Sequence, residues 1–170
     1  MPASSENREE RMIPSYLAMM ADSLDRKIEI LNRIEEENGK QHDILSKTGT
    51  VDMDAFDATV EAKGELIDEL DKLNDGFESL FSQVREELDG NKEKYKEEIT
   101  AMQEKIRTIT ALSGSIQAAE ARNRTLAEKY FADAKKDMVI GKKSAKAALD
   151  YYHNMARSTF TPPQYLDSKH

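Results

Sequence analysis

Residues 17–45, LAMMADSLDRKIEILNRIEEENGKQHDIL, carry the repeat that decides the fold class. Its members are Leu17, Leu24, Leu31, Asn38 and Leu45, seven residues apart, with Met20, Ile28 and Ile34 between them. Residues three, four and seven positions apart lie on one face of an α-helix. The repeat therefore predicts one amphipathic helix over residues 15–47, which begins just after Pro14.

Two further apolar series follow, each separated from its neighbour by a break signal. The segment SKTGTVD (residues 46–52) ends the first helix, and Asp52 or Asp54 can cap the next one. Gly90-Asn91 ends the second helix. The second apolar series keeps its phase across Gly76, so we predict that the helix continues through this glycine. The second series comprises Met53, Phe56, Val60, Ile67, Leu70, Phe77, Phe81, Val84 and Leu88, and the third comprises Tyr95, Ile99, Met102, Ile106, Ile109 and Ile116.

These repeats predict an all-α fold, an elongated antiparallel helical bundle or coiled-coil hairpin of about three long helices. Charged residues make up 34% and hydrophobic residues 38% of the 170 residues, a balance typical of long helices with narrow apolar stripes. We divide the chain into a disordered N-terminus (1–14), a helical bundle (15–140), and a C-terminal amphipathic partner-binding helix with a loose extended tail (141–170). At 1.5 Å per residue the first two helices span about 50 and 55 Å and the third could exceed about 70 Å, so it is expected to overhang the other two.

Several seam positions hold polar residues where the repeat requires apolar ones. They are Asn38, Lys63, Asn74, Ser113, Glu120 and Asn123. The favoured interpretation of the lysine and the three asparagines is that they fix helix register or extend their polar ends to solvent, with a binding role as the alternative. In residues 113–123 the polar side chains predict a helix without a tightly packed partner.

Aromatic residues gather toward the end of the chain, where the core pattern weakens. Six of the eleven Phe and Tyr residues lie in the last 41 positions: Tyr130, Phe131, Tyr151, Tyr152, Phe160 and Tyr165. From Phe131 the apolar pattern resumes one step out of phase, which rotates the stripe by about 100° and is expected to turn it away from the first two helices. The displaced stripe comprises Phe131, Ala134, Met138, Ala145, Ala148, Leu149, Tyr152 and Met155, and Pro162-Pro163 ends the helix.

Composition excludes several classes of protein. The formal net charge of −8 argues against nucleic-acid binding. Residues 1–120 carry 28 acidic and 15 basic residues (−13), whereas residues 121–170 carry 5 and 10 (+5), so the basic end suits an acidic partner or its own acidic half. The absence of cysteine excludes disulfides and fits a reducing cytoplasm. No apolar run approaches the roughly 20 residues of a membrane span, and MPASSENREER lacks the apolar region of a signal peptide, so we expect a cytoplasmic protein without membrane insertion.

No catalytic, cofactor or metal motif is found in the sequence. Di-iron bundles use Glu-x-x-His on two helices, but Gly39 lies three residues before His42 and Asp150 three residues before His153. Phosphate-binding glycine loops and the G-x-S-x-G motif are also missing. We therefore predict that the chain is not an enzyme and needs neither a cofactor nor a metal.

Three stretches carry a family resemblance: KGELIDELDKLNDGFESLFSQVREEL (63–88), MQEKIRTITALSGSIQAAEARNRTLAEKYF (102–131) and PQYLDSK (163–169). In this order they resemble flagellar export chaperones of the FlgN type, which serve type III secretion. The resemblance implies a cytoplasmic chaperone that binds the amphipathic C-terminal region of hook-associated proteins of the hook–filament junction. Such a chaperone prevents premature assembly and hands its substrate to the gate and ATPase components of the export apparatus.

The resemblance also implies roles for particular residues. The candidate contacts with the substrate protein are Tyr130, Phe131, Met138, Ala145, Ala148, Leu149, Tyr152 and Met155. Tyr165, or else Tyr151, is the candidate for docking on the export gate. Independently, residues 142–155 form an amphipathic stripe suited to helix-in-groove recognition, and at about 14 residues they are marginal as an isolated helix.

Two alternatives from other classes stay open. The same apolar stripe would also be buried if the third helix folds back or swaps into a second copy. The chain would then be a self-associating coiled-coil structural or adaptor protein with no export role. The other alternative, an enzyme, would require a reproducible metal or nucleotide stoichiometry.

Overall fold

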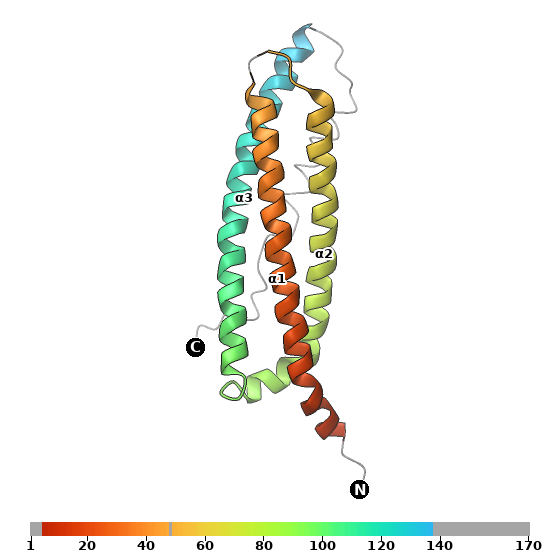
Figure 1. Ribbon diagram of the computed structural model, residues 1–170, viewed down its shortest axis with the longest axis vertical. Coiled ribbons are helices and arrows are strands. Elements are labelled where there is room, and N and C mark those ends of the chain that lie inside the picture. The colour runs from red at the N-terminus through yellow and green to blue at the C-terminus, as the bar shows by residue number, and fades with distance from the viewer. Residues whose placement is uncertain (1–4, 48, 138–170) are drawn as a thin grey trace.

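The computed structural model describes residues 5–47 and 49–137, with side chains over residues 12–47 and 49–134. It contains three long helices, α1 (Ser5–Ser46), α2 (Met53–Gly90) and α3 (Lys96–Asp137). Successive helices run antiparallel and pack as an elongated bundle (Figure 1). The predicted all-α fold with three long helices is confirmed.

α1 occupies the centre of the bundle. It packs against both α2 and α3, whereas the backbones of α2 and α3 do not come within 8 Å of one another, measured between Cα atoms. Figure 1 shows α1 between the other two helices. Contacts between α2 and α3 therefore depend on long side chains.

The beginning of α1 differs from the prediction. The helix starts at Ser5 and includes Pro14, instead of starting after that proline. Ile13 precedes Leu17 by four residues and is only 3% exposed, so it extends the apolar face of α1 by one turn. Burial of this side chain offsets part of the roughly 3 kcal/mol that a proline costs in a helix interior.

α2 is capped at both ends by the residues that the sequence indicated. The backbone N–H of Ala55 donates to the Asp52 carboxylate at 3.1 Å, which satisfies one of the free donors of the first turn. At the other end, the backbone N–H of Asn91 donates to the Leu88 carbonyl at 3.2 Å. Between these caps α2 passes Gly76 without interruption, as the phase of the apolar series predicted.

α3 continues unbroken through Gly114 to Asp137. Its first turn is closed by the N–H of Ile99, which donates to the Tyr95 carbonyl at 2.9 Å. Over the described residues α3 is as long as α1, at 42 residues, and its end extends past the α1–α2 connection (Figure 1). The predicted overhang is confirmed, and it arises from the offset between helices of equal length.

The core follows most of the predicted seams, although Ile30 is fully buried and the predicted Ile28 only partly buried. Its most deeply buried apolar side chains are Leu17, Met20, Leu24, Ile30, Leu31 and Ile34 of α1, Phe56, Leu70, Phe77 and Val84 of α2, and Met102, Ile109 and Ile116 of α3. None of the described helices has an apolar stretch long enough to cross a membrane.

Replacing Asp52 with alanine is expected to lower the free energy of unfolding by about 1 kcal/mol, because the cap of α2 loses its acceptor. Urea unfolding followed by circular dichroism measures this difference. Asp54→Ala is the matched control, since Asp54 lies in the same first turn and makes no capping bond. Equal losses in the two variants would contradict a specific role for Asp52.

Candidate functional site

A buried polar layer interrupts the apolar core in the half of the bundle near the α1–α2 connection. Its centre is Lys63 of α2, whose side chain is fully buried. The ammonium group donates to Asn38 Oδ1 at 2.8 Å, to Gln41 Oε1 at 2.9 Å and to the Glu120 carboxylate at 3.0 Å. Because the two amides belong to α1 and the carboxylate to α3, one lysine joins all three helices.

Further hydrogen bonds hold the partners of this lysine in place. Gln41 Nε2 donates to Thr59 Oγ1 at 3.1 Å, and the Thr59 hydroxyl donates to the Phe56 carbonyl at 2.6 Å. Asn123 Nδ2 donates to the Asn38 carbonyl at 3.0 Å and to Gln41 Oε1 at 3.2 Å. The side chains of the layer are thus fixed by bonds that run from α3 through α1 to α2.

Burial and neighbouring charges shift the pKa of Lys63 in opposite directions. Removal from water lowers the pKa of Lys63 from 10.5 to about 8, while the charge and hydrogen bonds of Glu120, and the charge of Glu37, oppose this change. Sliding one helix by a turn would leave the ammonium group buried without its acceptors. The layer therefore specifies helix register more than it adds stability.

The prediction that residues 113–123 lack a tightly packed partner is wrong. Ser113, Glu120 and Asn123 are 5%, 8% and 1% exposed. Glu120 and Asn123 are polar because they face polar groups of α1 and α2, not because they face solvent. The favoured interpretation of Asn38, Lys63 and Asn123, that they fix register, agrees with these buried hydrogen bonds.

A second buried lysine lies farther along the seam, on α1. Lys27 is 2% exposed, and its ammonium group donates to Asn74 Oδ1 on α2 at 2.9 Å. Burial lowers the pKa of Lys27 to about 8. Whereas Lys63 has a carboxylate partner, Lys27 is held by a neutral amide, and no described carboxylate forms an ion pair with it.

Lys27 and Gln41 are two seam residues that the sequence analysis missed. Each lies three residues after a member of the seven-residue series, Lys27 after Leu24 and Gln41 after Asn38, which is the second core position of each heptad. The apolar Ile28 was assigned to the stripe in place of its neighbour, yet Ile28 is only partly buried. A strict count of the period would have found both residues.

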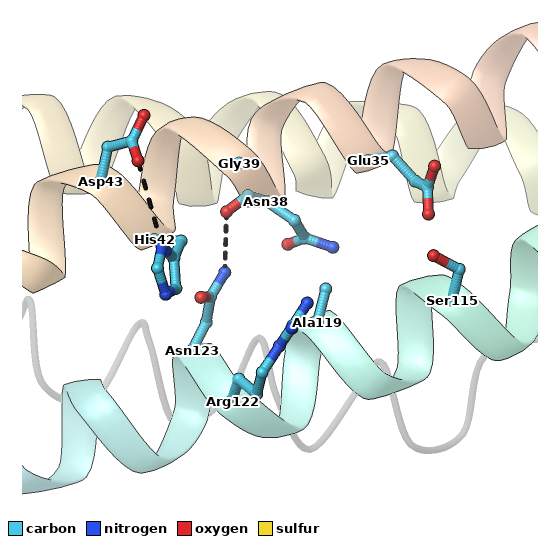
Figure 2. A pocket seen from close by; sticks show the side chains of 9 residues that line it. All are labelled: Glu35, Asn38, Gly39, His42, Asp43, Ser115, Ala119, Arg122 and Asn123. Carbon is cyan, nitrogen blue, oxygen red and sulfur yellow. Dashed lines mark hydrogen bonds and ion pairs between the residues drawn. The ribbon is translucent and has the colours of Figure 1, made fainter.

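A notch of about 400 Å³ opens between α1 and α3 beside the polar layer (Figure 2). It is lined by Glu35, Asn38, Gly39, His42 and Asp43 of α1 and by Ser115, Ala119, Arg122 and Asn123 of α3. Gly39, Ser115 and Ala119 leave the space because they are small, and a Cβ atom at Gly39 would meet no atom within 4 Å. The notch offers hydrogen-bonding groups and charges of both signs.

Metal or acid–base chemistry finds little support in the part of the chain that the structure describes. No group of three His, Asp or Glu residues is arranged there to hold a metal ion. His42 Nδ1 lies 3.9 Å from the Asp43 carboxylate, and both side chains are at least half exposed. The two side chains of this pair are therefore open to solvent.

Two candidate substrate contacts, Tyr130 and Phe131, fall within the described residues. Both are partly buried against the core, and Phe131 packs edge-on against Phe56 of α2 with ring centroids 5.9 Å apart. Phe131 therefore does not turn away from the first two helices as expected. It follows the buried Ala127 by four residues, which keeps it on the same face of α3.

The other candidate residues lie outside the described part of the chain. These are Met138, Ala145, Ala148, Leu149, Tyr152 and Met155 for substrate binding, and Tyr151 and Tyr165 for gate docking. Their roles stay predictions.

The described residues define a class by fold alone, an all-α three-helix bundle with a buried polar layer that joins its helices. No family model, no curated protein and no solved structure matches this chain.

Proposed function

We propose that this chain is a cytoplasmic export chaperone of the FlgN type. It binds the amphipathic C-terminal region of a hook-associated protein, prevents its premature assembly and hands it to the flagellar type III export apparatus. The proposal rests on the sequence resemblance and on the way the bundle ends.

The observation that carries the proposal is the aromatic end of the bundle. Tyr130 and Phe131 pack on one another with ring centroids 5.5 Å apart, and Phe131 covers Phe56 in the first turn of α2. α3 continues six residues beyond Phe131 to Asp137, or about 9 Å at 1.5 Å per residue. The described part of α3 thus ends shortly after an aromatic pair, and the amphipathic residues 142–155 follow it in the sequence.

In this proposal different segments of the chain have different roles. The three helices, registered by the Lys63 layer, form a stable support, and the apolar residues of 138–155 cover the substrate helix. Methionine and tyrosine suit such a contact because both present large apolar area and adapt to varied partners. Tyr165, or else Tyr151, then docks on the export gate.

A truncated chain of residues 1–140 is expected to lose binding to a purified C-terminal fragment of a hook-associated protein by about 100-fold or more, because the apolar anchors are removed. Its melting temperature should stay within a few degrees of that of the full chain. Isothermal titration calorimetry and thermal circular dichroism give the two values. In the full chain, Tyr152→Ala should weaken binding at least tenfold, whereas Lys142→Ala, the matched control, should not.

Unchanged binding by residues 1–140 would contradict the proposed binding segment. A large fall in the melting temperature would mean that residues 141–170 belong to the core. If the full chain does not bind the fragment and light scattering shows a stable homodimer, a coiled-coil adaptor is the better interpretation.

A further inference from the structure

We draw no further inference here: the strongest candidate, the side of the bundle between α2 and α3, where the two backbones stay more than 8 Å apart between Cα atoms, carries nothing because nothing in the described part of the chain shows what covers it.

Discussion

Replacing Glu120 with alanine is expected to lower the free energy of unfolding by about 3–5 kcal/mol. The reason is that the ammonium charge of Lys63 would remain in the core without its carboxylate partner. Lys63 is fully buried and forms an ion pair with the Glu120 carboxylate at 3.0 Å. Without that carboxylate the ammonium group must lose its proton, admit water or open the bundle, and each outcome costs stability. Urea unfolding followed by circular dichroism gives the value.

Two matched variants separate charge from packing. Glu120→Gln keeps the size and one acceptor oxygen and removes only the charge, so it should cost less than the alanine variant, about 1–3 kcal/mol. The double variant Lys63→Met with Glu120→Leu removes both charges and fills the space, and should recover most of the loss. If the double variant is as unstable as Glu120→Ala alone, the loss comes from a cavity and not from an unpaired charge.

The outline of the fold could be predicted because helix periodicity is a property of each segment alone. The series led by Leu17 and Leu24 defined α1, and the phase kept across Gly76 showed that α2 continues. The start of α1 was misplaced because Pro14 is a strong local signal, whereas the burial of Ile13 depends on its neighbours in the bundle. Local rules thus located the helices well and missed the point where tertiary contacts override them.

The polar layer was harder to predict, because its meaning depends on pairing between helices. Glu120 on α3 and Lys63 on α2 are 57 residues apart, and each considered alone is a charged residue that weakens an apolar seam. Only the relative register of the helices shows that the two charges meet within the core. A single sequence gives the position of each residue within its heptad. It does not give the axial register of α2 relative to α3.

The orientation of Phe131, at the aromatic end of α3, was also difficult to predict from the sequence alone. The one-residue slip at Phe131 predicted an outward stripe, because an ideal period was extended beyond Ala127. In the structure the step of four residues from Ala127 to Phe131 keeps the ring on the core side, against Phe56. A seam on a real helix tolerates both three- and four-residue steps, so a shift of one position does not by itself turn a face to solvent.

Replacing Lys27 with methionine is expected to stabilise the bundle at neutral pH by about 2–3 kcal/mol. Burial lowers the pKa of Lys27 from 10.5 to about 8, and a difference of this size corresponds to about 3 kcal/mol between the charged and neutral forms. Its partner, Asn74 Oδ1 at 2.9 Å, is a neutral amide and does not offset this cost fully. Methionine fits the same volume without a charge to desolvate.

The gain should depend on pH in a defined direction. Below pH 8 both the folded and the unfolded state hold the proton of Lys27, so the wild type bears the full cost of the buried charge and the methionine variant shows its full advantage. Between pH 8 and 10.5 the folded protein has released this proton while the unfolded chain still binds it, so wild-type stability rises with pH and the advantage declines. Lys63 titrates in the same range but is present in both proteins, so the difference isolates Lys27. Urea unfolding of both proteins from pH 7 to 10.5, with the exposed Lys72→Met as control, measures this decline. An advantage that stays constant with pH would show that the folded and unfolded states bind this proton equally, so that burial does not lower the pKa of Lys27.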